Sequence, residues 1–255
     1  MEGQRAIECA RVLAAGADGR GRTTRLDVRG ADARALRGGR RKARDVSARF
    51  QHAVASAARE SVTRVPVDDP IELFSTLFDR AARECSEPDA MVLSTVDADG
   101  RPSARYVLLK GVDQRGFVFY TNVESRKARA MAANRFAALT FYWPPLTQVR
   151  IEGDVERVPD ADADAYFATR PRGSQIGAWA SDQSAELGSR AALDVRVSEV
   201  EQRFANAPIT RPPFWIGYRV LPRSIEFWTR DLNRLHDRVV FKRDNGAWTR
   251  SLLYP

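Results

Sequence analysis

The stretch Arg105–Lys127, RYVLLKGVDQRGFVFYTNVESRK, decides the fold expected for this chain. Its runs at 105–110 and 117–120 are rich in β-branched and aromatic residues, which predicts two strands. Asp113–Gly116 between them has the composition of a turn. A helix is expected over residues 125–133. The stretch therefore predicts a strand–turn–strand unit that leads directly into a short helix.

The start of this helix has the properties of an anion site. Ser125 is a suitable N-cap, and Arg126 and Lys127 occupy the first turn, where backbone N–H groups have no helical partner. Free N–H groups, the helix dipole and two cations together attract a phosphate. An exposed basic helix start is the plainer interpretation of Ser-Arg-Lys alone. Arg105 and Lys110, at the two ends of the first strand, favour a phosphate cradle, because strand ends seldom carry cations without a ligand.

Length and composition indicate a globular protein. The chain has 255 residues, of which 44% are hydrophobic, enough for one large domain or two small ones. We find no apolar run of the ~20 residues that a membrane span needs and no convincing secretory signal. Two cysteines, Cys9 and Cys85, do not make a disulfide framework, and no Cys/His cluster indicates a metal site. We therefore expect a cytoplasmic protein.

Positive charge is concentrated at the N-terminus. The net charge is +8, and most of it belongs to the first 50 residues, whereas the remainder is close to neutral. This segment is rich in glycine and alanine, a composition that does not bury enough apolar surface to fold. We expect residues 1–66 to form a disordered basic arm and residues 67–255 to form one domain. Nucleic-acid binding by the arm is an alternative function, although a compositional bias toward arginine is the simpler explanation.

The remaining pattern predicts a β-rich α+β fold. Asp69-Pro-Ile-Glu72 is a capping-box sequence, and the apolar spacing after it predicts a helix to about Glu84. Further strands are expected at 91–97, 136–143, 147–158, 215–220, 225–228 and 235–241, with a last one near Trp248. Helices are expected at 160–170, capped by Asp160, and at 189–206, with a short helical or turn segment at 175–179. Antiparallel strands at short spacing predict a barrel, and neither a G-x-G-x-x-G nor a Walker pattern is present.

A second unusual segment is Arg234-Leu-His-Asp-Arg238. A solitary histidine such as His236 is commonly structural, and no nucleophile pattern or metal-ligand set accompanies it. Three cations within five residues, counting a protonated His236, suit a doubly charged ligand such as a phosphate ester. Tyr166 and Arg170 are four residues apart, so helical spacing places them on one face.

Seven motifs occur in a fixed order between Arg105 and Arg238: RYVLLK, FVFYTN, SRKA, QVRIEG, YFATRPRGSQIGAWASDQS, EFW and RLHDR. This series resembles the pyridoxamine 5′-phosphate oxidase family, and the resemblance runs from about Asp68 to the C-terminus. The resemblance implies a split β-barrel with flanking helices, bound flavin mononucleotide (FMN) and a homodimer with its two sites at the interface. It also implies an oxidase of vitamin B6 metabolism that forms pyridoxal 5′-phosphate from pyridoxamine or pyridoxine 5′-phosphate. Hydride would pass from the substrate C4′ to flavin N5, and O2 would reoxidise the flavin and give H2O2.

The resemblance also assigns site residues. The implied FMN contacts are Arg105, Lys110, Tyr120, Thr121, Arg126, Lys127, Gln148, Gln183, Ser184, Trp228 and Arg238. The substrate phosphate would be held by Tyr166, Arg170 and Ser174, with Lys110 nearby, while Arg234 and His236 would face the pyridine ring as the catalytic residues. The phosphate cradle inferred from the residues alone is thereby assigned to the flavin phosphate.

Two segments depart from the family pattern. Thr229–Asn233, between EFW and RLHDR, lacks a glycine, and the region upstream of the first helix reads Ala53–Ala58 in place of an Arg-x-x-Tyr segment. Two alternatives to the implied function stay open. One is a related split-barrel flavin oxidase that acts on another ring, such as a phenazine. The other is a non-catalytic binder of FMN or pyridoxal phosphate.

Overall fold

The computed structural model describes residues 68–144 and 147–255, to which all structural statements refer. The predicted arm over residues 1–66 and the segment Ala53–Ala58 lie outside them. The helices are α2 (Pro70–Glu84), α3 (Arg126–Ala133), α4 (Asp160–Thr169), α5 (Arg172–Ala180) and α6 (Arg190–Arg203). The strands are β1 (Ala90–Val96), β2 (Pro102–Leu108), β3 (Gly111–Asp113), β4 (Gly116–Asn122), β5 (Phe136–Trp143), β6 (Thr147–Arg157), β7 (Trp215–Thr229), β8 (Asp237–Asp244) and β9 (Ala247–Leu252).

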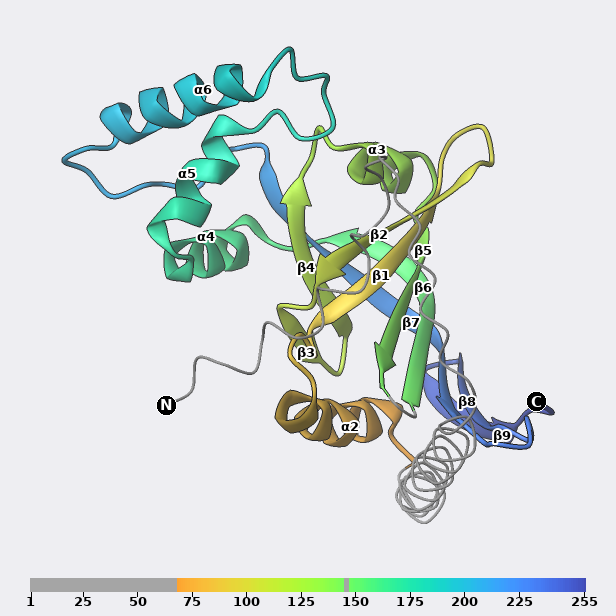
Figure 1. Cartoon of the computed structure of the whole chain (residues 1–255). Coiled ribbons are helices and arrows are strands. Elements are labelled where there is room, and N and C mark those ends of the chain that lie inside the picture. Colours follow the sequence, from red (N-terminus) through yellow and green to blue (C-terminus); the bar gives the residue numbers. More distant parts are fainter. Residues whose placement is uncertain (1–67, 145–146) are drawn as a thin grey trace, which may run out of the picture. The chain divides into compact units, whose positions relative to one another are not determined.

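The nine strands form one antiparallel sheet (Figure 1). Its order is β2-β1-β5-β6-β7-β4-β3, and β8 and β9 extend it beyond β7. Alternate residues of the strands point into one hydrophobic core, which includes Leu93, Leu139, Ile151 and Phe227. The residues between them face the other side, so a strand such as β6 alternates buried and partly exposed positions along its length.

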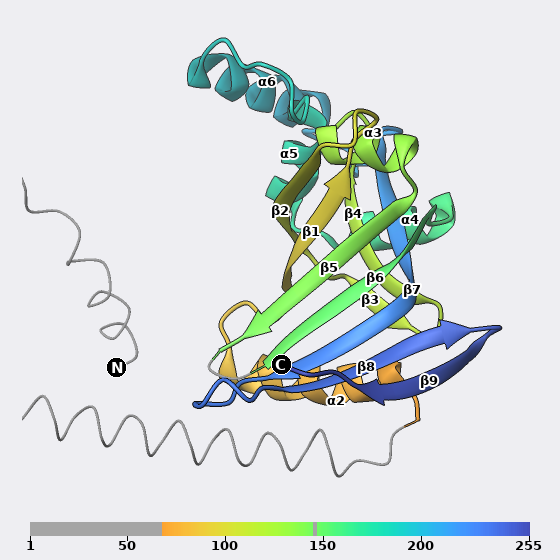
Figure 2. The same cartoon turned by 90° about the vertical axis from the view of Figure 1, so that its right-hand side faces the viewer.

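Helix α2 closes one end of the sheet (Figure 2). Asp69 caps it by accepting a hydrogen bond from Ile71 N at 2.8 Å, as the capping-box sequence predicts. Phe74 is fully buried and its ring lies 4.8 Å from Phe117 and 5.1 Å from Phe141. Truncating a phenylalanine packed in this way costs about 3–5 kcal/mol. The predicted extent of α2 is confirmed, and the helix is part of the main core.

The strand predicted at 105–110 begins and ends earlier than expected. β2 ends at Leu108, and the short strand β3 follows it and pairs with β4. Between them the backbone changes partner: Leu109 N donates to Asp89 O and Lys110 N donates to Val118 O, both at 2.8 Å. The prediction that Lys110 ends a strand is therefore wrong. Residue propensities do not predict that the pairing of this segment changes from β1 to β4.

The strands predicted at 215–220 and 225–228 are one continuous strand, β7. Its residues 218–229 pair with β6, and the pairing shifts between Glu152 and Gly153. A side chain at Gly153 would place its Cβ 2.0 Å from Leu221 O. The sequence predicted two strands here, whereas the irregularity bends one strand without ending it.

Helices α4 and α5 pack beside the start of β7 in a second hydrophobic cluster. Its buried members are Phe167, Ile176, Phe204, Ile209 and Trp215. The prediction that Asp160 caps α4 is wrong, because Pro159 holds the N-cap position and no side chain caps the helix. Asp160 accepts instead from Arg157 and Arg211. No helix in the described part of the chain has the length and apolar character to cross a membrane.

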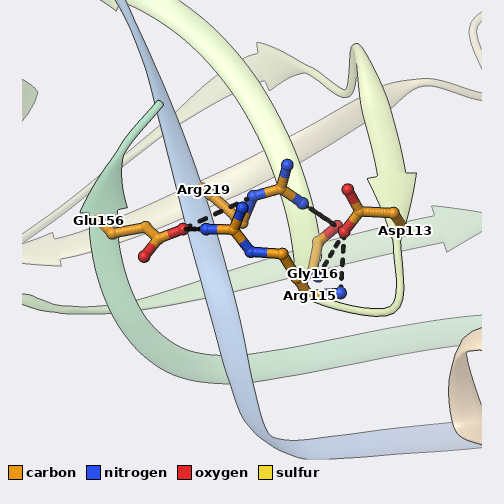
Figure 3. Close-up of polar contacts among 5 residues, drawn as sticks. All are labelled: Asp113, Arg115, Gly116, Glu156 and Arg219. Carbon is orange, nitrogen blue, oxygen red and sulfur yellow. Dashed lines mark hydrogen bonds and ion pairs between the residues drawn. The ribbon is translucent and has the colours of Figure 1, made fainter. Parts of the chain in front are cut away.

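A charged cluster ties the β3–β4 turn to β6 and β7 (Figure 3). Arg219, only 7% exposed, donates to the Asp113 carboxylate and lies 3.8 Å from Glu156. Arg115 pairs with the same Glu156. Burial opposes ionisation of Asp113, but hydrogen bonds from Arg219 and from the turn amides outweigh it and lower the pKa of this carboxyl. Carboxylates thus neutralise the buried charge of Arg219.

Candidate active site

A cavity of about 520 Å³ opens between β2, β4, the start of α3, helices α4 and α5, and the start of β7. Eight of the predicted site residues line it. They are Lys110, Tyr120, Thr121, Lys127, Tyr166, Arg170, Ser174 and Gln183. The structure therefore brings together residues from four separate motifs. Because the cavity contains both predicted phosphate sites, it is the candidate active site.

The start of α3 forms the predicted cradle. Ser125 is the N-cap and accepts from Ala128 N at 3.4 Å. Lys127 Nζ donates to Thr121 Oγ1 at 3.1 Å and to Gln183 Oε1 at 2.8 Å. Arg126 N donates to Ser184 Oγ at 3.2 Å. These contacts join the helix start to Gln183 and Ser184, which are far away in sequence.

The cradle carries an excess of positive charge. Burial, together with repulsion from Arg105, lowers the pKa of Lys127 to about 8. Burial and the nearby Arg126 lower the pKa of Arg105 in the same way. Across the described residues, none of these three cations forms an ion pair with a carboxylate. An anion in the cradle would relieve this repulsion.

Arg105 and Lys110 are not the unpartnered strand ends that the sequence suggested. Arg105 lies within β2, and its guanidinium donates to Leu93 O and Thr95 Oγ1 at 2.9 Å and to Ser103 Oγ at 2.7 Å. Lys110 Nζ forms an ion pair with Asp89 at 2.6 Å. Arg105 is therefore a rigid cation of the cradle, while the charge of Lys110 is already compensated.

A turn across the cradle is tied to helix α6. Gln183 and Ser184 belong to it, and Ser184 has a left-handed backbone with φ of 76°. The neighbouring Asp182 accepts two hydrogen bonds from Arg196 of α6, one of 2.8 Å. These bonds lower the pKa of Asp182. The ion pair fixes the turn at a point next to the two residues that contact α3.

One wall of the cavity is aromatic. The rings of Tyr120, Tyr166 and Trp215 lie nearly parallel, with Tyr120 4.4 Å from Tyr166 and 4.9 Å from Trp215. Arg170, the C-cap of α4, has its Cζ 4.9 Å from the Trp215 ring centroid. Its Nη1 is buried without a hydrogen-bond partner. A buried donor without a partner is costly unless a ligand satisfies it.

Three other predicted residues, Trp228, Arg234 and His236, line a different hollow of about 360 Å³. The rings of Trp228 and His236 are 4.5 Å apart, and His236 Nδ1 accepts from Asp231 N at 3.0 Å. Gln148, Trp228 and Arg238 are cross-strand neighbours on β6, β7 and β8. The structure of one chain thus divides the predicted site into two groups.

The segment without glycine, Thr229–Asn233, forms a compact turn. Asp231 Oδ1 accepts from Asn233 N at 2.8 Å, and Arg234 takes a left-handed backbone with φ of 67°. Such a conformation usually favours glycine. The side chain of Asp231 supports this turn in place of a glycine.

Trp215 lines the cavity although the sequence interpretation assigned it only to a strand. Gly217, two residues further along β7, could have drawn attention to it. A glycine inside a strand often marks a close approach of other groups, and here it accommodates the Tyr120 ring. The function of a tryptophan at a strand start is otherwise not visible from sequence spacing.

A split barrel with a cationic cradle at a helix start defines the class: a split-barrel protein with a site suited to phosphate-bearing ligands. Residues 78–204 match the family model described as pyridoxamine 5′-phosphate oxidase. Residues 215–255 match the pyridoxine 5′-phosphate oxidase C-terminal dimerisation region. The chain belongs to the pyridoxamine 5′-phosphate oxidase family, which confirms the predicted resemblance.

Known proteins support this assignment. The chain is 59% identical over 189 residues to the pyridoxine/pyridoxamine 5′-phosphate oxidase of Myxococcus xanthus (strain DK1622), covering 73% of this chain and 92% of that one. PhzG from Burkholderia lata 383, solved in complex with tetrahydrophenazine-1-carboxylic acid, is 32% identical with a TM-score of 0.71, covering 77% and 96%. A pyridoxamine 5′-phosphate oxidase-related, FMN-binding protein from Nostoc punctiforme PCC 73102 shares the fold, with 16% identity, a TM-score of 0.61 and coverage of 73% and 98%. The predicted split-barrel fold is confirmed.

Proposed function

We propose that this protein is an FMN-dependent oxidase that converts pyridoxamine or pyridoxine 5′-phosphate to pyridoxal 5′-phosphate. One observation carries the proposal: a single cavity contains two separate cationic sites, at Lys127 and at Arg170. FMN and the substrate each carry one phosphate monoester. An enzyme that holds both at once needs two such sites within one cavity.

The residues at the start of α3 fit the phosphate of FMN. Arg105, Arg126 and Lys127 supply positive charge, and the helix start supplies N–H donors. Gln183 and Ser184 already contact this cradle and would lie beside the cofactor. When bound, FMN supplies a two-electron acceptor for the substrate C4′ carbon and is regenerated by O2.

The polar groups beside the aromatic wall fit the substrate phosphate. The buried Nη1 of Arg170 is a free donor, and Tyr166 and Ser174 line the same part of the cavity. Together they would bind the phosphate and so orient the pyridine ring. Holding the reacting carbon close to the acceptor is the main contribution that a protein makes to this kind of reaction.

We propose that the second group of residues completes the cavity of a partner chain in a homodimer. The match of residues 215–255 to a dimerisation region supports this arrangement. In the group, Gln148, Trp228 and Arg238 would contact FMN, and Arg234 and His236 would face the substrate ring. Because His236 Nδ1 accepts a hydrogen bond from Asp231 N, the neutral imidazole carries its proton on Nε2. A cytoplasmic location, a role in vitamin B6 metabolism and a domain over residues 67–255 preceded by an arm belong to the same proposal.

The test is anaerobic mixing of the FMN-loaded protein with pyridoxine 5′-phosphate while the visible flavin absorbance is followed. The expected result is bleaching that reverses when air is admitted, with pyridoxal 5′-phosphate and H2O2 as products. An unchanged spectrum despite bound flavin would contradict the oxidase and leave a non-catalytic binder.

A second function is oxidation of a phosphate-free ring, which the 32% identity to PhzG brings into consideration. The two substrates differ in their need for Arg170. Replacing Arg170 by methionine would strongly weaken the binding of a phosphate ester and only slightly weaken the binding of a phosphate-free ring. Flavin reduction by tetrahydrophenazine-1-carboxylic acid, with none by pyridoxine 5′-phosphate, would favour the second function.

A further inference from the structure

We infer that Trp215 is a positioning residue for the substrate phosphate, because its indole ring orients the Arg170 guanidinium without neutralising the charge. The inference rests on the proposed function, since it concerns how the phosphorylated substrate is held. It assigns to Trp215 a task that no sequence motif indicated.

The indole of Trp215 is fixed by its surroundings. The residue is 7% exposed and begins β7. Its ring is parallel to that of Tyr120 within 2° at 4.9 Å, and Phe167 meets it edge-on at 5.1 Å. Such aromatic pairs contribute beyond the area they bury. The ring therefore has one orientation, which sets the position of anything that packs on it.

Gly217 makes this stack possible. It is the direct cross-strand neighbour of Tyr120, and a Cβ at this position would lie 2.7 Å from Tyr120 Cε1. The Tyr120 ring thus occupies the space above β7 that a side chain would fill, and it lies flat toward Trp215. Tyr166 of α4 adds a third ring at 4.4 Å from Tyr120.

Arg170 packs on this surface. Its Cζ lies 4.9 Å from the centroid of the Trp215 ring and 5.5 Å from that of Phe167. It forms no ion pair within the described residues, and its Nη1 is buried without a partner. The ring attracts the guanidinium through its quadrupole and leaves the full charge in place.

An aromatic support suits a ligand site better than a carboxylate would. A carboxylate would orient Arg170 equally well, but it would compete with the phosphate for the same N–H donors. The ring fixes the side chain before the ligand arrives, so less rotamer entropy is lost on binding. The geometry thus points to a guanidinium that is held in advance and ready for a dianion.

The test compares Trp215→Leu and Trp215→Phe in the full-length, FMN-loaded protein. Flavin reduction at increasing pyridoxine 5′-phosphate yields an apparent Kd and a limiting rate. Trp215→Leu is expected to raise the apparent Kd about tenfold, with limiting rate and FMN affinity within about twofold of wild type. Trp215→Phe retains a ring and is expected to recover most of the affinity. Trp248→Leu removes another tryptophan that packs against an arginine, Arg243, and serves as the matched control.

A double-mutant cycle with Arg170→Met separates positioning from general damage. If Trp215 acts through Arg170, then Trp215→Leu changes the Kd by less than about twofold when Arg170 is already absent. A full tenfold effect in that background would overturn the inference, as would an unchanged Kd in Trp215→Leu alone. Equal losses of FMN and substrate affinity would also contradict it, since they indicate a distorted cavity.

Two further measurements keep the inference testable if other steps fail. Should the wild-type protein show no flavin reduction, the oxidase is refuted, and the same variants are compared by equilibrium titration with pyridoxal 5′-phosphate. Should Trp215→Leu not fold, Gly217→Ala displaces the Tyr120 ring while keeping the indole, and a rise in Kd of about threefold is expected. No rise in that variant would overturn the inference.

Discussion

Two arginines, Arg219 and Arg170, have opposite electrostatic surroundings. Arg219 lies against the carboxylates of Asp113 and Glu156, so its charge is neutralised and its donors are used (Figure 3). Arg170 lies against aromatic rings, keeps its charge and has a buried donor without a partner. The two regions contain the same functional group, buried at Arg219 and partly buried at Arg170.

Opposite charges nearby distinguish a cation that stabilises the fold from one that serves a ligand. Burying a charge is costly, and a protein that gains only stability from it supplies an opposite charge. Where that charge is missing, the protein tolerates the cost until a ligand removes it. The cradle at Lys127 likewise lacks a nearby carboxylate. Lys110 is intermediate, because it lines the cavity but its charge is paired with Asp89. The following predictions test this rule, starting from the largest expected effect.

Replacing Arg170 by methionine should raise the KM for pyridoxine 5′-phosphate by about 100-fold, because a charge-assisted contact to a dianion is lost. The free energy of unfolding should not fall, since a buried donor without a partner is removed. Steady-state kinetics and urea unfolding check the two parts. Arg223→Met, at an exposed pair with Asp154, is the control and should change neither quantity.

Replacing Arg219 by methionine should have the reverse profile. The free energy of unfolding should fall by about 2 kcal/mol, less than for a fully buried pair because Asp113 and Glu156 keep part of their solvent contact. Affinities for FMN and substrate in the folded protein should stay within about twofold. A large loss of ligand affinity without a loss of stability would contradict the assigned structural role.

The FMN affinity should depend on pH through Lys127. The pKa of this lysine is lowered to about 8 in the free protein, and a bound phosphate favours its charged form, so FMN binding takes up a proton above that pH. Affinity is therefore expected to fall about fivefold from pH 8 to about pH 9. Fluorescence titration measures it.

Lys127→Met is the control for this pH effect. Its FMN affinity should be weaker at pH 7 and nearly constant up to about pH 9. An unchanged pH dependence in the variant would show that another group titrates. The stability of the free wild-type protein depends on the same group. The pKa of Lys127 is about 8 in the folded protein and 10.5 ordinarily, so the unfolded chain holds the proton more tightly. The contribution of Lys127 to the free energy of unfolding therefore increases as the pH rises from about 8 toward 10.5.

The smallest effect is expected at the pair between Arg196 and Asp182. Arg196→Gln should lower the affinity for FMN by about two- to threefold, because exposed ion pairs contribute little to stability. This pair acts on FMN only by fixing the turn that carries Gln183 and Ser184. Arg190→Gln on the same helix, which disrupts a pair with Asp194 that does not touch the turn, is the matched control. Equal effects of both changes would indicate general weakening of α6.

Local chemistry was readable in the sequence wherever neighbouring residues decide the outcome. The caps Asp69 and Ser125 are where the sequence predicted them. Where packing overrides local preference, prediction failed: Asp160 does not cap α4, and Lys110 does not end a strand. The assignments of individual site residues remain predictions, which the variants above test.

The sequence by itself determined the caps, the alternating strands and the ordered motifs that place the chain in its family, since these depend on residues a few positions apart. Only the tertiary structure determines which cations lie beside a carboxylate and which do not. Tyr120 and Trp215 meet across β4 and β7, and Arg219 reaches Asp113 over 106 positions. Division of the site into two groups was likewise decided by the path of the sheet. Contacts over such distances arise from packing of the whole domain, and spacing along the chain does not encode them locally.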